Sequence, residues 1–395
     1  MVCAFQWHST EGNKQQVSTL FTGISELRTI TDGVIKDAAL VEEDGKVAWV
    51  GARTDAPAAD ESVDFGGRAV LPGWVDSHSH MIFDGNRAEE FEARMAGKDY
   101  QAGGIAVTMD ATRNAGEQRL RDLLDMRIRA AQAGGTTTIE TKTGYGLDVA
   151  SETEAARLAA ERLEDVTFLG AHLVPPGVDT EEYLDLVVGE MLDSVAPHAK
   201  WIDVFCERGA FNEEQSRRVL EAGKAKGLGL KVHGNQLGHG PGVQLAVSLD
   251  AASVDHVNYV TDEDVEALAN SNTVATCLPA CDLSTRQPLA PGRRLLDAGV
   301  TVALATNLNP GTSYTSAMNY CVTTAVLQMG LSLDEALEAA TLGGAKALRR
   351  DDVGYLAVGA KADLHVLDTA NAIDLAYRPG MPLTYATYVG GKQVH

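Results

Sequence analysis

The middle of the chain alternates between short apolar runs and helical patterns, and this alternation constrains the fold more than any other feature. Eight runs rich in β-branched residues recur between residues 69 and 310, among them TTTIETKTGYG, WIDVFCE and TVALATNLNP. Stretches between them, such as 116–134 and 151–165, carry helical periodicity, and the second opens on a Ser-x-Glu start. Continuous apolar runs are typical of buried parallel strands, and strand–helix alternation gives a parallel sheet. Eight such units match an α/β fold, a (β/α)8 barrel of the TIM type, which typically needs about 250 residues.

A doubly wound open sheet is the alternative fold for such a chain. That fold usually carries a GxGxxG motif directly after its first strand. The segment after the first predicted strand reads DSHSHMIFDG and contains no such motif. The sequence therefore favours the barrel.

The two ends of the chain have a different texture. LFTGISELRTI, AALVEEDGKVAWVGA and ESVDFGGRAVLP read as short strands separated by turns, and GAKADLHVLDT and PLTYATYVGGKQV return to that pattern near the C-terminus. Chain ends usually lie close together at the surface of a domain. We therefore predict a small β-sandwich domain formed by both termini, residues 1–70 and 355–395, beside a barrel domain of residues 71–354.

Composition narrows the class of partner. The chain has 33 Lys plus Arg against 55 Asp plus Glu, a formal net charge of -22. Such a surface repels phosphate backbones and anionic lipid, so we expect a small-molecule substrate and neither nucleic acid nor a membrane. The N-terminal MVCAFQWHSTEGNKQQ lacks the basic and apolar regions of a signal peptide. The five cysteines are odd in number and form no CxxC pair, which favours a reducing, cytoplasmic location: Cys3, Cys206, Cys277, Cys281 and Cys321.

Polar side chains gather where the predicted strands end, which is where (β/α)8 barrels carry their catalytic groups. Five of the ten histidines stand at such ends, namely His78, His80, His172, His233 and His256. The other polar residues at or just beyond strand ends are Glu140, Tyr145, Glu207, Asn235, Gln236 and Asn307. So many imidazoles at one end of one sheet predict a functional site.

The His78-x-His80 pair predicts a metal centre at this end of the barrel. Residues i and i+2 of an extended strand point the same way, so both imidazoles can aim at one point. Neutral imidazole is a common ligand of zinc and suits iron as well. His233 can supply a third ligand, and barrel closure would bring the end of strand eight next to strand one.

Several segments of the chain resemble those of a known family. LPGWVDSHSH, the histidines of strands five and six and the terminal GAKADLHVLD are similar to the metal-dependent amidohydrolase superfamily. Within it, the chain resembles the imidazolonepropionase family, which takes part in histidine degradation. The segments that carry this narrower resemblance span nearly the whole barrel region: DGNRAEEFEARMAG, ETKTGYGLD, LGAHLVP, WIDVFCERGAF, HGNQL, DHVNY and NPGTS.

The resemblance implies a role for each matching residue. His78, His80 and His233 would bind one zinc or iron ion, with the strand-eight residue Asn307 as fourth protein ligand. Arg87 would hold the propionate carboxylate of 4-imidazolone-5-propionate. Tyr145, His172 and Gln236 would contact the imidazolone ring and its side chain. Asn309, Gly311 and Thr312 would hold the product end, and His256 would polarise the carbonyl or transfer a proton. The resemblance also implies a homodimer.

Two positions bear on metal count and turnover. Dinuclear members of the superfamily carry a modified lysine at the end of strand four, where this chain has Glu207, so we expect one metal; Lys142 on strand two is expected to be solvated or ion-paired.

The family has an Asp directly before the NPG loop, where this chain has Asn307. An amide is no base near neutral pH. Asn307 is then a deliberate substitution, a natural variant that uses His256 or Glu207 as base, or the mark of a relative without activity.

Three other functions remain open from the sequence. Another mononuclear amidohydrolase, a cyclic-amidine deaminase or an iminohydrolase, is the nearest. Deaminase relatives usually carry an acid in an HxxE motif after strand five, whereas this chain has HGNQ with Gln236. A metal-dependent binding protein without turnover and a purely structural barrel are the other two.

Overall fold

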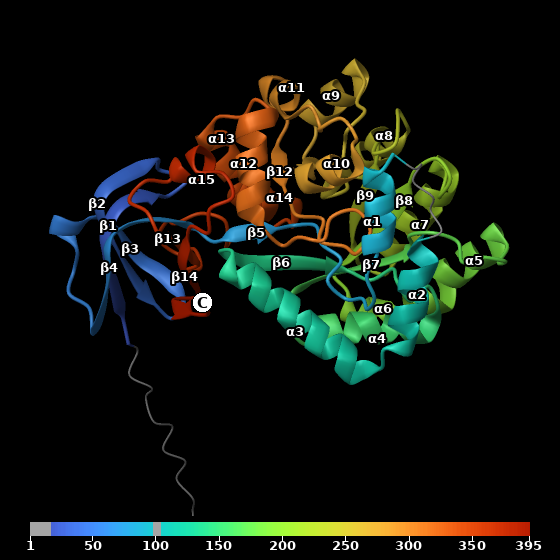
Figure 1. The fold of residues 1–395 in the computed structure, drawn as a ribbon, viewed down its shortest axis with the longest axis horizontal. Coiled ribbons are helices and arrows are strands. Elements are labelled where there is room, and N and C mark those ends of the chain that lie inside the picture. The colour runs from blue at the N-terminus through green and yellow to red at the C-terminus, as the bar shows by residue number, and fades with distance from the viewer. Residues whose placement is uncertain (1–16, 98–103) are drawn as a thin grey trace, which may run out of the picture.

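The computed structural model describes residues 17–97 and 104–395. Eight parallel strands form the central sheet, in which each strand hydrogen-bonds to the next one along the chain (Figure 1). The strands are β5 (Trp74–Asp76), β6 (Thr136–Lys142), β7 (Asp165–Ala171), β8 (Trp201–Cys206), β9 (Gly229–Gly234), β10 (Ser253–His256), β11 (Val274–Cys277) and β12 (Val302–Leu304). The predicted (β/α)8 barrel is confirmed.

The barrel closes through the segments that follow its first and last strands. The backbone N–H of Asn307 donates to the carbonyl of His78 at 2.9 Å, and that of His80 donates to Leu308 at 2.8 Å. The N–H of Thr306 donates to the buried carboxylate of Asp76 at 3.0 Å. Strand eight therefore meets strand one at the end of the barrel where His78, His80 and Asn307 lie.

Helices connect the strands and cover the outside of the barrel (Figure 1). They are α1 (Ala88–Met95), α2 (Gly104–Asn114), α3 (Glu117–Ala133), α4 (Val149–Ala160), α5 (Thr180–Leu186), α6 (Leu192–Val195), α7 (Glu213–Ala225), α8 (Gly242–Ser248), α9 (Asp262–Ala269), α10 (Pro279–Thr285), α11 (Gly292–Asp297), α12 (Met318–Gln328), α13 (Leu333–Glu338) and α14 (Gly344–Ala347). No helix in the described ranges is long and apolar enough to cross a membrane.

Two local expectations need correction. The helix expected over 151–165 begins at Val149 and ends at Ala160, because Asp148 caps it by accepting the N–H of Ser151 and β7 already begins at Asp165. The first barrel strand ends at Asp76, so His78 and His80 lie in the segment after it rather than in extended strand.

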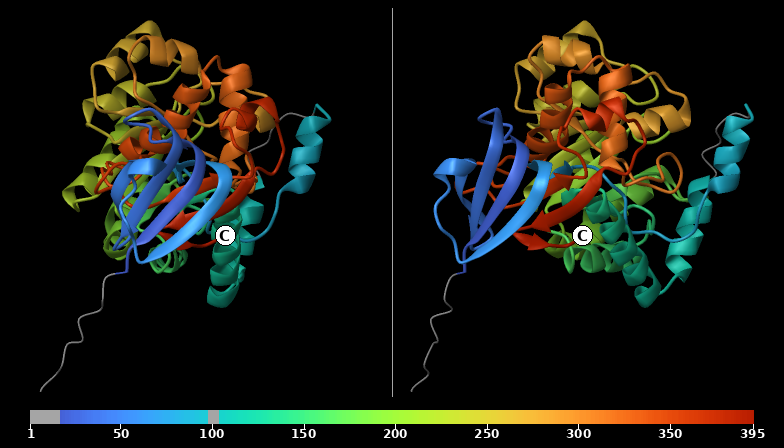
Figure 2. Two further views of the ribbon diagram at one scale, coloured as in Figure 1. Left: turned by 90° about the vertical axis from the view of Figure 1, so that its left-hand side faces the viewer. Right: turned by 60° about the vertical axis from the view of Figure 1, so that its left-hand side comes forward.

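Both ends of the chain contribute to a second, seven-stranded sheet (Figure 2). Its strands, in chain order, are β1 (Thr19–Arg28), β2 (Val34–Glu43), β3 (Lys46–Ala52), β4 (Glu61–Pro72), β13 (Leu364–Leu367), β14 (Thr384–Val389) and β15 (Lys392–Gln393); a short helix, α15 (Asp374–Tyr377), lies between β13 and β14. Two strands separate β1 from β14, yet the rings of Phe21 and Tyr388 lie 5.1 Å apart. The sheet is therefore strongly curled around one apolar cluster.

The second sheet fits the small domain expected from both termini. Residues 1–16 of that predicted domain, with Cys3 and the segment in which we expected no signal peptide, lie outside the described residues. The boundaries at residues 70 and 355 stay a prediction. β4 runs to Pro72 and β5 starts at Trp74, so one stretch of chain leaves the second sheet and enters the barrel.

Candidate active site

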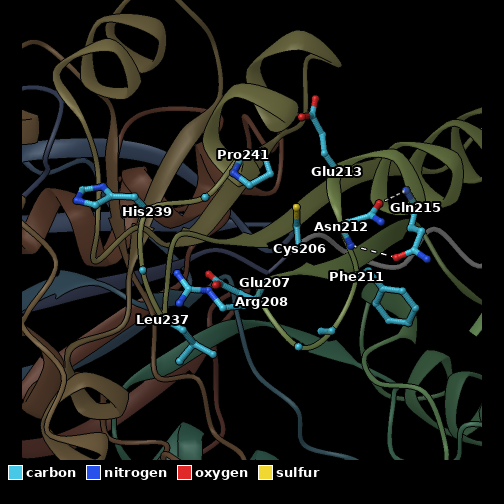
Figure 3. A pocket seen from close by; sticks show the side chains of 14 residues that line it. Cys206, Glu207, Arg208, Phe211, Asn212, Glu213, Gln215, Leu237, His239 and Pro241 are labelled. Carbon is cyan, nitrogen blue, oxygen red and sulfur yellow. Dashed lines mark hydrogen bonds between the residues drawn. The ribbon is translucent and has the colours of Figure 1, made fainter.

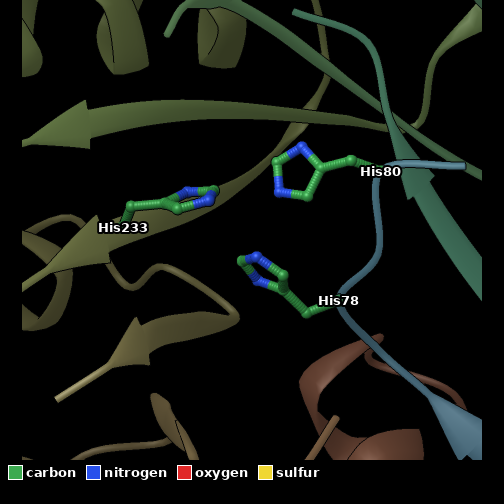
Figure 4. A group of neighbouring side chains, drawn as sticks. All are labelled: His78, His80 and His233. Atoms are coloured by element: carbon green, nitrogen blue, oxygen red, sulfur yellow. The ribbon is translucent and has the colours of Figure 1, made fainter. Parts of the chain in front are cut away.

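Three imidazoles meet at the end of the barrel where its strands terminate (Figure 4). His78 and His80 follow β5, His233 lies on β9, and one ligand nitrogen from each lies within 4.8 Å of the others. All three are buried. His78 Nε2 and His80 Nδ1 have no hydrogen-bond partner there. Buried polar atoms without a partner are costly, and a metal ion would satisfy them, so these residues fit a metal centre.

Buried carboxylates orient two of these imidazoles. His78 Nδ1 lies 2.6 Å from Asp255 Oδ2, and His233 Nδ1 lies 3.0 Å from Asp203 Oδ2. An ionised carboxylate only accepts, so each Nδ1 carries its proton and each Nε2 presents a lone pair. Burial lowers the pKa of His78 well below its usual value, which keeps the ring neutral, the state that a metal ligand requires.

Lys142 forms ion pairs with both of these carboxylates and with a third, that of Glu140. Its Nζ lies 2.9 Å from Glu140 Oε1, 2.9 Å from Asp203 Oδ2 and 3.9 Å from Asp255 Oδ2, and all four side chains are fully buried. Burial alone would lower the pKa of Lys142, but Asp203, Glu140 and Asp255 together raise it, so the ammonium stays charged. Lys142 is therefore ion-paired and not solvated.

Sequence reasoning missed Asp203 and Asp255 as part of the site. Both interrupt otherwise apolar strands, in WIDVFC and SVDH. A buried strand carboxylate needs a partner, and an aspartate within a predicted barrel strand is the signal that could have found them.

Asn307 lies beside the imidazoles, three residues beyond the end of β12. Its backbone is left-handed, with φ 51°, and its Oδ1 is buried without a hydrogen-bond partner. His256 ends β10 with φ 84°, and its ring lies 5.4 Å from that of His233 and 5.8 Å from that of His78. This fourth imidazole thus borders the cluster, and Asn307 lines the same cavity as His256.

A cavity of about 250 Å³ opens above the imidazoles. It brings together most of the residues predicted from the sequence: His80, Arg87, Tyr145, His172, His233, Gln236, His256, Asn307, Asn309 and Thr312. Gly311 lies behind Arg87, where an added Cβ would come within 2.3 Å of Arg87 Nη1. The sequence did not single out four further polar residues of the wall: Arg94, Arg208, Thr285 and Gln287.

The arginines give the cavity a positive wall in an acidic protein. Glu90 holds Arg87 in a bidentate pair, with Nε donating to Oε2 at 2.7 Å and Nη2 to Oε1 at 2.8 Å. Arg94 Nη2 donates to the carbonyl of Gly311 at 3.0 Å. Planar guanidinium groups fixed in this way suit recognition of a carboxylate.

Glu152 organises the loop that carries Tyr145. Its buried carboxylate accepts the backbone N–H groups of Gly144, Gly146 and Leu147, at 2.9, 2.7 and 2.8 Å. His172 Nδ1 lies 2.8 Å from the carbonyl of Gly144 and so carries its proton. Burial lowers the pKa of His172 to about 4, so this ring is neutral. One carboxylate on α4 thus positions two side chains of the cavity wall.

The loop after β12 is fixed by its own side chains. Asn309 Oδ1 accepts the N–H groups of Gly311 and Thr312, at 2.9 and 2.8 Å. Asn309 Nδ2 donates to the carbonyl of Asn307 at 2.7 Å. These contacts hold the loop rigid at the rim of the cavity.

Glu207 takes a different place from the other predicted residues. It lies directly after β8 and accepts the N–H of Gln236. It lines a neighbouring cavity of about 400 Å³, together with Arg208, Leu237 and His239 (Figure 3). Burial raises the pKa of its carboxyl. The structure thus brings His256 to the imidazole cluster, whereas Glu207 lines the neighbouring cavity and is hydrogen-bonded to the backbone of Gln236.

A family model and similar proteins indicate the same family for this chain. Residues 69–394 match the model described as the amidohydrolase family. The chain is 63% identical over 383 residues to an imidazolonepropionase of Saccharopolyspora erythraea, which covers 95% of this chain and 99% of the relative. It is 60% identical over 401 residues to an imidazolonepropionase of Paenarthrobacter aurescens, covering 95% and 98%.

Solved structures share the fold at much lower identity. A zinc-bound adenosine deaminase from Xanthomonas campestris superimposes with a TM-score of 0.74 at 19% identity, covering 95% of this chain and 92% of that one. A triazine hydrolase variant superimposes with a TM-score of 0.75 at 19% identity, covering 95% and 94%. At this identity the likeness concerns the fold alone.

Proposed function

The chain belongs to the amidohydrolase family and, within it, to the imidazolonepropionases, and from this we propose that it hydrolyses a ring C–N bond of 4-imidazolone-5-propionate. The product would be N-formimino-L-glutamate, a step of histidine degradation. The observation that carries the proposal is the cavity itself, in which His80 and His233 of the buried three-histidine cluster face the residues that the family resemblance assigns to the substrate.

We propose that one metal ion, zinc or iron, is held by His78, His80 and His233, with Asn307 Oδ1 as a fourth ligand. When bound, such an ion lowers the pKa of water and polarises a carbonyl group. The unpartnered nitrogens and the unpartnered amide oxygen support this set of ligands. Glu207 at the end of β8, in the place of a bridging lysine, supports a single ion.

The remaining residues would bind and orient the substrate. Arg87, held flat by Glu90, would bind the propionate carboxylate with its guanidinium group. Tyr145, His172 and Gln236 would contact the ring, and the loop with Asn309, Gly311 and Thr312 would hold the product end. Exclusion of water from so small a cavity strengthens each of these polar contacts.

Proton transfer would fall to His256. An amide at position 307 neither takes a proton from water nor returns one to the departing nitrogen. Of the two alternative bases, His256 lines the cavity and borders the imidazole cluster, whereas Glu207 hydrogen-bonds to backbone in the neighbouring cavity. His256 would also donate a hydrogen bond to the oxygen on which negative charge develops.

From the family we further infer that the protein acts in the cytoplasm as a homodimer. The acidic net charge of -22 supports a small-molecule substrate rather than nucleic acid.

The test is consumption of 4-imidazolone-5-propionate by metal-reconstituted protein, with Arg87→Ala beside the wild type. We expect the wild type to form N-formimino-L-glutamate, and Arg87→Ala to raise KM about a hundredfold or more, because a charge-assisted bidentate contact is lost. Unchanged KM in Arg87→Ala would contradict the assigned substrate orientation. Tight substrate binding without any product would indicate a binding protein, and release of ammonia without ring opening would indicate a deaminase.

A further inference from the structure

A second cluster of metal-binding side chains lies next to the three imidazoles. It consists of His256 at the end of β10 and of Cys281 and Asp282 in the first turn of α10. One ligand atom from each residue lies within 4.8 Å of the others. The side chains are 2%, 0% and 1% exposed, so water does not compete for them as it does at a surface cluster.

Two polar atoms in and beside this cluster lack partners. His256 Nδ1 is buried with no hydrogen bond, and so is Oδ1 of Asn258, the residue two positions further along the chain. The neighbouring groups are held in place: Asn258 Nδ2 donates to the carbonyl of Pro288 at 2.7 Å, and Asp282 Oδ2 accepts the N–H of Ala290 at 3.2 Å. A fixed, buried cluster with an unpartnered imidazole nitrogen is therefore already assembled.

The chemistry of the donors selects the kind of ion. Imidazole, thiolate and carboxylate are the three protein ligands of zinc, and thiolate favours soft ions over magnesium or calcium. One thiolate and one carboxylate together carry two negative charges, which balance a divalent cation without leaving net charge in the buried site. The cluster of His78, His80 and His233 holds neutral donors only, so the two clusters differ in charge and in softness.

We propose that His256, Cys281 and Asp282 form a second cation site, which takes a thiophilic divalent ion such as Zn²⁺ or Cd²⁺. On binding, the thiol proton of Cys281 leaves to solvent as the sulfur–metal bond forms, and no redox change occurs. His256 links the two clusters in space, because its ring lies 5.4 Å from that of His233. An ion here would hold the imidazole that we assign to proton transfer. Excess metal should therefore inhibit turnover, a consequence that rests on the proposed function.

The site is tested by titrating Cd²⁺ into protein that already carries one equivalent of zinc. Cadmium bound to thiolate gives an ultraviolet charge-transfer absorption, which three histidines do not give. We expect one further equivalent to bind with this absorption in the wild type, and both to be lost in Cys281→Ser. Cys321→Ser is the matched control, since Cys321 is also a buried free thiol, and its Sγ lies 3.5 Å from the carbonyl of Ala305. Cys3 is present in all variants, so any contribution it makes to the cadmium–thiolate absorption is the same in each.

A second variant, Asp282→Asn, keeps the proposal testable if Cys281→Ser does not fold. Asp282→Asn keeps the thiol and removes one anionic donor, so we expect the affinity for the added Cd²⁺ to fall at least about tenfold. Circular dichroism reports whether each variant is folded. If Cys281→Ser is not folded, the Cd²⁺ affinity of Asp282→Asn tests the proposal instead. The proposal is overturned if no further equivalent binds to the wild type, or if the absorption survives in folded Cys281→Ser or the affinity is unchanged in Asp282→Asn. Because no substrate is present, this result is independent of whether the protein hydrolyses the imidazolone.

Discussion

Asn307 occupies a left-handed backbone position, φ 51°, which Asn and Asp adopt more readily than other residues with a side chain beyond Cβ. Asn307→Asp therefore changes an amide to a carboxylate with almost no change in shape. A carboxylate there would both bind a metal ion more strongly and accept a proton, and a positioned base is worth about 10²–10⁴ in rate. We expect Asn307→Asp to raise kcat at least about a hundredfold, measured as substrate consumption at equal metal content.

Equal kcat values for the wild type and Asn307→Asp would contradict the expected increase. They would leave His256 as the base of the native site. Metal content must be measured in both, because a stronger ligand at position 307 also raises occupancy. The comparison is made at saturating metal to separate the two effects.

Site residues at strand ends could be predicted from the sequence, whereas those that depend on pairing between distant strands could not. The histidines and Asn307 were predictable because barrels place catalytic groups at strand ends. The contact between Lys142 and Asp203 joins β6 to β8 across 61 residues, and no local pattern encodes such a pairing. Arg94 was missed because on α1 it reads as an ordinary helical arginine, yet it is buried against Gly311.

Three strands meet at the ammonium group of Lys142, which lies on β6 and contacts carboxylates of β6, β8 and β10. Lys142→Met would leave buried carboxylates without a counter-ion, and breaking a buried pair in this way costs about 3–5 kcal/mol. It would also free Asp203 and Asp255 from the positions in which they orient His233 and His78. We expect metal affinity to fall about 10–100-fold, measured by competition with a chelator.

Lys200→Met is the control for the loss of a lysine. Lys200 precedes β8, its side chain is 52% exposed, and its Nζ lies 3.6 Å from Asp165. We expect this variant to bind metal as the wild type does. If Lys142→Met also binds metal as tightly as the wild type, the network does not orient the ligands.

The loop between β6 and α4 depends on a single carboxylate, because Glu152 accepts three of its backbone N–H groups. Glu152→Gln keeps the size of the side chain but replaces charge-assisted hydrogen bonds by weaker neutral ones and adds a donor that faces other donors. Tyr145 and His172 would lose their fixed positions. We expect KM to rise about tenfold, equivalent to about 1.4 kcal/mol, with metal content unchanged.

Glu154→Gln is a matched control on the same helix, where Glu154 is half-buried and outside the loop contacts. A loss of metal from Glu152→Gln, or an equal rise of KM in Glu154→Gln, would show that the effect is general destabilisation. We therefore expect KM to rise in Glu152→Gln and to stay unchanged in Glu154→Gln.

Over the whole molecule, the fold was predictable to the level of architecture. Turn residues marked the hairpin between β2 and β3, where Asp44 and Gly45 have φ 54° and 78°, and apolar runs marked the barrel strands. The curled sheet was less predictable in detail, because β1 pairs with β4 in parallel and β13 inserts between β4 and β14. The pairing of β13 with β4 joins Leu364 to Pro72, almost 300 positions apart, and periodicity does not report such a pairing.

His365 lies where the second sheet meets the barrel. It belongs to β13, its Nε2 lies 2.9 Å from Thr384 Oγ1, and its ring packs edge-on against Trp74 of β5 at 5.0 Å. Gly135, with φ 92°, passes so close that an added Cβ would come within 2.5 Å of the imidazole. Burial lowers the pKa of His365 from 6.5 to about 3. The junction therefore tolerates only the neutral ring.

This histidine makes the junction sensitive to acid. Below pH 6.5 the unfolded chain takes up a proton at His365 while the folded protein does not, until the pH approaches about 3. The stability that neutral His365 contributes is therefore complete above pH 6.5 and is lost as the pH falls, at about 1.4 kcal/mol per pH unit. Between pH 7.5 and pH 5 we expect the free energy of unfolding of the wild type to fall by about 2 kcal/mol more than that of His365→Gln. Urea unfolding at the two pH values measures this difference, in which other titrating groups cancel. The same pH dependence in both proteins would mean that the imidazole is protonated in the folded state.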